Sequence, residues 1–295
     1  MLIAAVHTPF SADGSLTTRP ITDQAQSLAA AGVDGVFIAG TTGESVSLSV
    51  AERMKLAEAW SPAARQHRLA LFVHVGSQSL VDARALAKHA GELAVDAISA
   101  MAPCYFKPAT CEDLAAFLAE VAAAAPATPF YYYDIPSWTG VTFRSSELLE
   151  THADRIPSLA GIKYTSADLV DFQRCIAARG GRFRLYWGCD EALLAGLALG
   201  THGAIGSTYN FAAAQARAVM NAFQRGDLAA ARAAQGEIIR IVDAIARHGY
   251  LRASKSLMAM IGIDCGSVRP PLRPMDGGEL PRLRSDCSAA GLALT

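Results

Sequence analysis

Lys163 ends an apolar run and is followed at once by polar residues. The run, residues 158–162, has the length and apolarity of a strand buried on both faces, and residues 164–168 indicate a loop that enters a helix. A lysine at the carboxyl end of a buried parallel strand is placed to act as a desolvated amine nucleophile. The alternative is an ordinary solvated lysine at a strand end. The residues at the ends of the other strands decide between the two interpretations.

A tyrosine and two threonines follow two of those other predicted strands. Tyr133 ends an aromatic run and can place its phenol beside Lys163 as a proton shuttle, although most of that run is expected to pack in the core. Thr41 and Thr42 stand between glycines and crowd hydroxyl and backbone N–H donors into one turn. Such a turn suits a small carboxylate or phosphate, unless it only turns the chain.

Acids and hydroxyls follow two further predicted strands. Asp190 and Glu191 are either polar groups at a cavity mouth or ordinary acids that favour a helix N-terminus. Residues 206–210 add hydroxyls and an amide, as a polyol substrate requires. An amine nucleophile, a phenol, an anion cradle and a polyol-binding rim together indicate a class I aldolase.

Short apolar runs alternate with helix-length segments eight times within about 225 residues, which predicts a closed α/β barrel, the (β/α)8 TIM barrel, with its chemistry on the loops that follow the strands. A doubly wound sheet is the alternative, but residues 7–10 offer no Gly-rich phosphate loop after the first strand. The predicted strands are residues 2–6, 35–38, 69–73, 97–100, 130–133, 159–162, 183–187 and 204–205, and the predicted helices are residues 21–31, 50–66, 79–94, 111–125, 145–152, 168–178, 191–199 and 211–224.

The chain continues beyond the eighth unit with three more helical patterns, at residues 228–247, 251–261 and 279–292. We therefore expect a catalytic barrel domain over residues 1–225. Residues 226–295 are expected to form a C-terminal helical extension packed on the barrel or on a neighbouring subunit.

Composition excludes several classes of protein. The chain is 52% hydrophobic and 18% charged, as in a well-packed globular protein, and its net charge of −1 gives no footprint for nucleic acid or an anionic membrane. No apolar stretch approaches the roughly 20 residues of a spanning helix. Six cysteines without a C-x-x-C pair predict reduced thiols in the cytoplasm, and seven scattered histidines without H-E-x-x-H spacing predict no metal site.

These loops, in their order and spacing, resemble the dihydrodipicolinate synthase and N-acetylneuraminate lyase superfamily of pyruvate-dependent class I aldolases over nearly the whole chain. The synthase branch carries an arginine, for a second substrate carboxylate, in the loop after the tyrosine strand; residues 137–139 contain none. The segments that carry the superfamily resemblance are residues 40–44, 74–76, 133–136, 161–163 and 206–210, and those that resemble the N-acetylneuraminate lyase branch are residues 135–141, 163–166, 188–191 and 205–210.

The resemblance implies a role for each matched residue. Lys163 would form the Schiff base, Tyr133 would transfer the proton, and Tyr105 would join the proton relay from a neighbouring subunit, with Phe106 as the alternative alignment. Thr41 and Thr42 would hold the pyruvate carboxylate, and Thr42 is counted among the catalytic residues. The residues that would bind the sugar chain are Thr165, Gly188, Asp190, Glu191 and Ser207.

The implied reaction is the cleavage of N-acetylneuraminate, a sialic acid, to N-acetylmannosamine and pyruvate by a homotetramer. It needs no metal or organic cofactor, because the iminium is the electron sink. We expect a mouth without a second cation, which disfavours substrates that carry an extra carboxylate. The alternatives are an aldolase for another 2-keto-3-deoxy sugar acid, a 4-hydroxy-tetrahydrodipicolinate synthase, and a non-catalytic sugar-acid-binding barrel.

Overall fold

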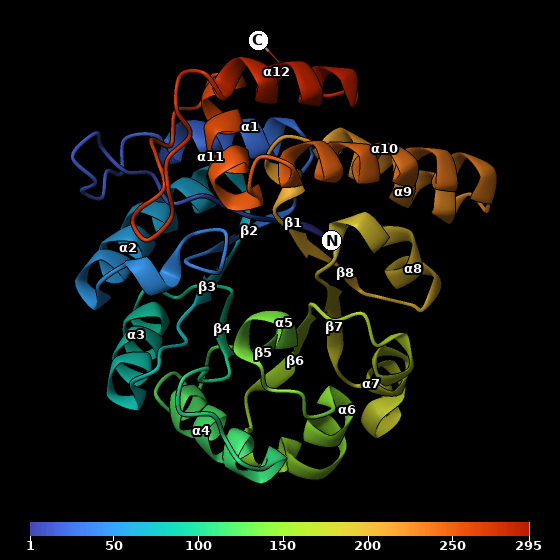
Figure 1. Ribbon diagram of the computed structural model, residues 1–295. Helices are drawn as coiled ribbons and strands as arrows, with labels where there is room; N and C mark the ends of the chain where they lie inside the picture. Colours follow the sequence, from blue (N-terminus) through green and yellow to red (C-terminus); the bar gives the residue numbers. More distant parts are fainter. Residues whose placement is uncertain (295) are drawn as a thin grey trace.

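Eight parallel strands close into a barrel in the computed structural model, which describes residues 1–294 (Figure 1). Each strand pairs with the next along the chain, and β8 pairs with β1 to close the sheet. The (β/α)8 TIM barrel predicted from the sequence is confirmed. The strands are β1 (Leu2–Ala5), β2 (Gly35–Ile38), β3 (Ala70–His74), β4 (Ala97–Met101), β5 (Phe130–Asp134), β6 (Leu159–Tyr164), β7 (Arg184–Trp187) and β8 (Gly203–Gly206).

Side-chain alternation along the strands divides the core into two layers. Tyr131 and Tyr133 belong to the cluster inside the barrel, whereas Tyr132 belongs to the cluster between the strands and the surrounding helices. This arrangement follows from the period of two in a strand. In β5 and β6 the same period brings Tyr133 directly opposite Lys163.

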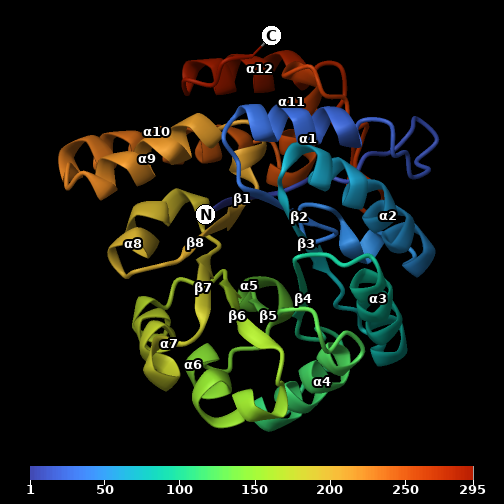
Figure 2. The same ribbon diagram turned by 180° about the vertical axis from the view of Figure 1, so that it is seen from behind.

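Helices form a ring outside the strands (Figures 1 and 2). Capping boxes at Ser49 and Thr110 begin two of them, because each side chain accepts the backbone N–H three residues later. The helices of the ring are α1 (Ile21–Ala30), α2 (Val50–His67), α3 (Leu80–Glu92), α4 (Cys111–Ala123), α6 (Ser145–Glu147), continued by the π-helical η2 (Leu148–His152), α7 (Leu169–Gly181), α8 (Leu193–Ala198) and α9 (Ala213–Gln224).

Three of these helices differ from their predicted form. The one expected at residues 145–152 is α-helical only in α6 and continues as the π-helical η2. The segment expected at residues 191–199 is divided into a 3-10 turn, η4 (Asp190–Ala192), and α8. The segment expected to end at residue 178 extends to Gly181, but non-helical backbone at residues 178–180 kinks it. Where a helix divides or kinks depends on its packing against neighbouring elements. The spacing of apolar residues in the sequence does not predict these positions.

The C-terminal segment contains α10 (Leu228–Ala246), α11 (Tyr250–Met260) and α12 (Leu280–Ala289). These helices lie together beside α1 at one side of the barrel (Figures 1 and 2) and share a second apolar core that includes Ile245, Leu257 and Leu283. Because α10 also packs along α9, the division of the chain into residues 1–225 and 226–295 stays a prediction. Within residues 1–294, no helix combines the length and the apolarity needed to cross a bilayer.

Gly161 offers a test of how tightly the strands pack. It pairs with Arg184 of β7, and a Cβ at Gly161 would collide with the Arg184 backbone carbonyl. Gly161→Ala should therefore lower the free energy of unfolding, by roughly 1–3 kcal/mol, as overpacking does. Urea unfolding measures this change.

The matched control is Gly236→Ala in α10. A Cβ there meets only the tip of Arg240, 3.7 Å away. This substitution should raise the free energy of unfolding by roughly 0.5–1 kcal/mol, because alanine favours a helix interior over glycine. Equal effects of the two substitutions would contradict the packing argument.

Candidate active site

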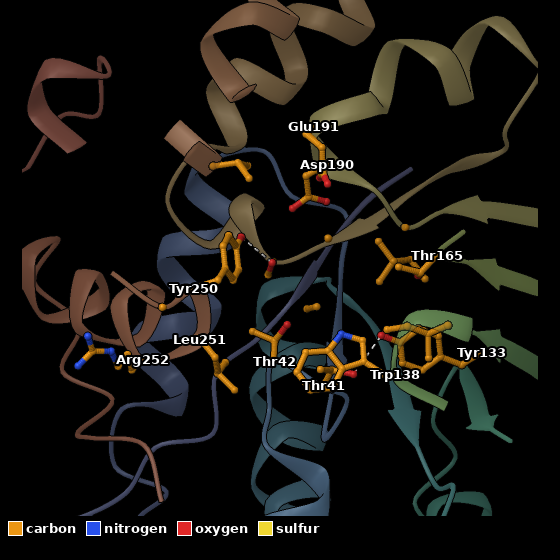
Figure 3. Close-up of a pocket in the computed structure, with 18 of the residues that line it drawn as sticks. Thr41, Thr42, Tyr133, Trp138, Thr165, Asp190, Glu191, Tyr250, Leu251 and Arg252 are labelled. Carbon is orange, nitrogen blue, oxygen red and sulfur yellow. Dashed lines mark hydrogen bonds between the residues drawn. The ribbon is translucent and has the colours of Figure 1, made fainter. Parts of the chain in front are cut away.

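A pocket of about 660 Å³ opens at the carboxyl ends of the strands. Figure 3 shows Tyr133 and Arg252 at opposite sides of it, with Thr41 and Thr42 between them. Every residue predicted for the site lines this pocket except Tyr105. The predicted residues around the pocket are Thr41, Thr42, Tyr133, Lys163, Thr165, Gly188, Asp190, Glu191 and Ser207.

Lys163 lies on β6 inside the barrel and is only 4% exposed. Its Nζ lies 3.9 Å from the ring centroid of Tyr133 and 4.2 Å from that of Phe37. Among residues 1–294, no carboxylate forms an ion pair with this amine. Lysines are almost never this deeply buried without a partner, so the position of Lys163 indicates a chemical role.

Tyr133 is held by neighbours on β2, on β3 and in the turn that follows β2. Its hydroxyl lies 3.2 Å from Thr41 Oγ1, and its ring packs edge to face against Phe37 and His74. Burial, together with the nearby Arg53 guanidinium, keeps the pKa of His74 well below its ordinary value, so this imidazole is a neutral packing partner. The phenol is thereby fixed beside Lys163. Sequence reasoning missed Phe37, although alternation along β2 places it on the inner face.

The turn that follows β2 carries Thr41 and Thr42, both half-buried. It is bent by two non-glycine residues with left-handed backbone, Ala39 (φ 52°) and Glu44 (φ 55°). The Thr8 hydroxyl donates to the Gly43 carbonyl at 2.6 Å and ties the turn to the segment that follows β1. Left-handed backbone outside glycine is held only where the surroundings fix it, so this turn is rigidly built.

Asp190 and Glu191 do not form a pair of acids at the mouth. Asp190 is buried, and its Oδ2 accepts the Thr208 backbone N–H at 2.8 Å and the Thr208 hydroxyl at 2.7 Å. Burial raises the pKa of Asp190, although the bonds from Thr208 oppose the shift. Glu191 is exposed. Gly206 is a glycine because a Cβ there would collide with the Asp190 carboxylate.

Two buried oxygens in the pocket wall are left without a partner. Thr165 Oγ1 and Asp190 Oδ1 find no hydrogen bond within residues 1–294. Gly188 lies beside the first of them, and a Cβ there would overlap the Thr165 side chain. Buried polar groups are nearly always satisfied, so these oxygens are available to a polar ligand or to water in the pocket.

The start of α11 supplies pocket residues that sequence reasoning missed. Tyr250, Leu251 and Arg252 line the pocket, and the Tyr250 hydroxyl lies 2.8 Å from Ser207 Oγ (Figure 3). No strand-end rule identifies them, because they come from the C-terminal extension. The only local signal is Gly249, whose φ of 79° turns the chain into α11.

The expectation of a mouth without a further cation is wrong. Arg252 and Arg273 both line the pocket. Arg252 donates to both carboxylate oxygens of Glu279, at 3.1 and 2.9 Å, and Arg273 also binds this carboxylate. The hydrogen bonds from Arg252 contribute most to lowering the pKa of Glu279, to about 2. The rim therefore contains cations, and Glu279 neutralises part of their charge.

Tyr105 lies outside the pocket of its own chain. It is 81% exposed, and its ring packs edge to face against the equally exposed Phe106. A role for Tyr105 across a subunit interface stays a prediction.

One group of potential metal ligands occurs in the described part of the chain. Cys111, Glu147 and His152 lie within 4.8 Å of one another. None of them lines the pocket, so they hold no metal at the candidate active site.

The fold and the site define a (β/α)8 barrel with a buried, unpaired lysine and a tyrosine side by side in one pocket. The model of the dihydrodipicolinate synthetase family matches residues 1–290, so the chain belongs to this family, as predicted. The chain is 41% identical to rat N-acetylneuraminate lyase over 276 residues, which cover 92% of this chain and 86% of the rat protein.

Solved structures give the same relationship. N-acetylneuraminate lyase from Proteus mirabilis superimposes with a TM-score of 0.96 at 39% identity, over 99% of this chain and 98% of that one. N-acetylneuraminate lyase (sialic acid aldolase) from Aliivibrio salmonicida gives a TM-score of 0.96 at 38% identity, over 99% and 97% of the two chains.

Asp190→Ala should destabilise the protein. It leaves the buried N–H and hydroxyl of Thr208 without their acceptor, which costs roughly 1–3 kcal/mol of unfolding free energy. Glu191→Ala, at the exposed neighbour, should change it by less than about 0.5 kcal/mol. Urea unfolding of both variants measures the difference. A fully stable Asp190→Ala protein would show that Asp190 does not hold the loop after β8.

Proposed function

We propose that the protein is a Schiff-base aldolase that cleaves N-acetylneuraminate to N-acetylmannosamine and pyruvate. The observation that carries the proposal is the buried Lys163 amine, which has no carboxylate partner and lies against Tyr133 in a pocket with unsatisfied oxygens. Relatives named N-acetylneuraminate lyase, about 40% identical over most of the chain, support the choice of substrate.

Lys163 acts as the nucleophile. Its neutral amine attacks C2 of the open-chain keto acid, and loss of water leaves an iminium. The electrons of the breaking C3–C4 bond move into this iminium to give an enamine. Protonation of the enamine at C3 and hydrolysis then release pyruvate and regenerate the amine. The iminium is the electron sink, so the reaction needs neither a metal nor an organic cofactor.

Tyr133 transfers the proton. The Tyr133 phenol gives its proton to the hydroxide that leaves when the iminium forms, and the resulting phenolate receives the C4 hydroxyl proton, through the substrate carboxylate, as the C3–C4 bond breaks. The contact of 3.2 Å between Tyr133 and Thr41 places the phenol next to the residues proposed to bind that carboxylate. Tyr105 of a neighbouring subunit in a homotetramer completes the proton relay. The exposed aromatic pair of Tyr105 and Phe106 supports such a contact between copies.

The sugar chain extends from the inner end of the pocket toward α11. Thr165 Oγ1 and Asp190 Oδ1 are free to bind its hydroxyls, and Glu191 and Ser207 lie farther along the wall. The backbone at Gly188 completes this wall. A volume of about 660 Å³ suits a small-molecule substrate. We place the reaction in the cytoplasm, because all six cysteines are free thiols.

The synthase alternative is less well supported. A substrate with a second carboxylate needs a free cation, and residues 137–139 supply none. Arg252 and Arg273 lie at the rim but are bound to Glu279. An aldolase for another 2-keto-3-deoxy sugar acid would use the same lysine, tyrosine and threonines.

Borohydride trapping tests the mechanism. Pyruvate and borohydride should add one reduced pyruvyl group per chain, on Lys163, because this amine is buried in the pocket without an acid partner. Peptide mapping by mass spectrometry locates the adduct, and Lys163→Met is the control that should take up none. An adduct on Lys107 or Lys255 would contradict the proposed mechanism.

A substrate panel tests the specificity. Pyruvate release should be fastest with N-acetylneuraminate among sialic acids and other 2-keto-3-deoxy acids, and condensation of pyruvate with aspartate semialdehyde should be at least ~100-fold slower, since a desolvated carboxylate without a cation is costly. A coupled pyruvate assay and product analysis measure the two reactions. Efficient semialdehyde condensation without sialic acid cleavage would replace the proposed substrate but keep the Schiff-base chemistry.

A further inference from the structure

A buried ion pair joins the C-terminal extension to the turn that carries Thr41 and Thr42. Lys255 Nζ on α11 lies 2.7 Å from Glu44 Oε1, and each of the two side chains is only 1% exposed. Neither residue lines the pocket. The pair therefore does not touch a substrate there, and it lies directly behind the pocket wall.

The second Glu44 oxygen is also bound by the extension. Glu44 Oε2 accepts the Arg269 backbone N–H at 2.9 Å, and the Arg269 guanidinium donates to the Ser47 carbonyl at 2.8 Å. Phe10 lies close to both cations, with its ring centroid 3.8 Å from Lys255 Nζ and 4.1 Å from the Arg269 guanidinium carbon. The turn after β2 is thus fixed from outside at both oxygens of one carboxylate.

The ammonium of Lys255 depends on Glu44. Burial lowers the pKa of Lys255, and the neighbouring Glu44 carboxylate opposes that shift. His7 also lies close by, and burial together with Lys255 lowers its pKa to about 3, so it stays a neutral partner of Ser254. If either member of such a pair is removed, an uncompensated buried charge remains.

Glu44 is connected to the threonines through the turn itself. Its backbone N–H donates to the Thr41 carbonyl at 3.0 Å, and the Ser45 N–H donates to the Gly40 carbonyl at 3.1 Å. Its φ of 55° is a left-handed value that needs external support. Thr41 in turn contacts the Tyr133 hydroxyl at 3.2 Å. Movement of the Glu44 carboxylate therefore displaces Thr41 and Thr42.

We infer that Lys255 and Glu44 are positioning residues, which hold residues 40–44 so that Thr41 and Thr42 meet the carboxylate of the keto acid. This role rests on the proposed function. It assigns the C-terminal extension a part in binding pyruvate, separate from its part in the pocket wall. The distal sugar is bound elsewhere in the pocket, so the pair should affect the two halves of the substrate unequally.

Lys255→Met tests this inference, because it removes the charge and keeps most of the side-chain volume. The pyruvate concentration that gives half-maximal trapping at Lys163 should rise ~10-fold or more, since small misplacement of positioning groups has large effects. In the synthesis direction, KM for pyruvate should rise by a similar factor. KM for N-acetylmannosamine should stay within about twofold of the wild-type value. The matched control is Lys88→Met, which removes an exposed lysine paired with Glu92 and should leave all three values unchanged.

The double variant Lys255→Met/Glu44→Gln separates positioning from simple stabilisation. It leaves no unpaired charge, so its melting temperature should recover relative to Lys255→Met, but its half-saturating pyruvate concentration should stay raised. This variant also decides the matter if Lys255→Met fails to fold. If the double variant recovers both its melting temperature and its half-saturating pyruvate concentration, the positioning role is wrong. It is also wrong if KM rises equally for pyruvate and N-acetylmannosamine. Neither result would contradict the proposed function. Absence of trapping in the wild-type protein would overturn the proposed function, and with it this role of the pair.

Discussion

The register between β5 and β6 is the constraint on which the rest of the site depends. It sets Tyr133 directly opposite Lys163, inside a barrel filled by aromatic side chains. Both groups are therefore largely removed from water and cannot move apart without breaking a strand pair. A slip of one residue in either strand would turn one of them to the outer face, where the helices pack. The closed barrel prevents such a slip, because every strand is hydrogen-bonded on both sides.

The C-terminal extension completes the pocket that the barrel begins. Its residues Tyr250 and Arg252 form part of the wall, and Lys255 and Arg269 reach the turn behind the threonines. The contacts of Lys255 and Arg269 with Glu44 join residues more than 200 positions apart in the chain. An extension that only covered apolar surface would need none of them, so α11 is as much a part of the site as the strand ends are.

Most of the fold could be predicted from the sequence, because apolar runs and the helical spacing of apolar residues indicate which side chains are buried. Every strand was found within two residues at each end, and the inward direction of Tyr133 followed from alternation. The site was predictable only where it follows a strand. Tyr250 and Arg252 follow no strand and match no motif, so only tertiary packing brings them into the pocket. The sequence also did not predict that Asp190 is buried and Glu191 exposed. Two adjacent acids have the same sequence signature, and only tertiary packing makes one of them buried.

The distribution of charge around the pocket favours one orientation of the proposed keto acid substrate. Among the described residues that line it, the basic side chains are Lys163, Arg252 and Arg273. The two arginines share Glu279 at the outer rim, so their attraction for an incoming anion is reduced there. Lys163, at the inner end of the pocket, is the one of these three side chains that has no carboxylate partner. The hydroxyls of Thr41 and Thr42 line the same pocket. In the proposed reaction, a substrate with one carboxylate and a neutral polyol chain would therefore bind with the carboxylate innermost, which would bring its C2 to the amine.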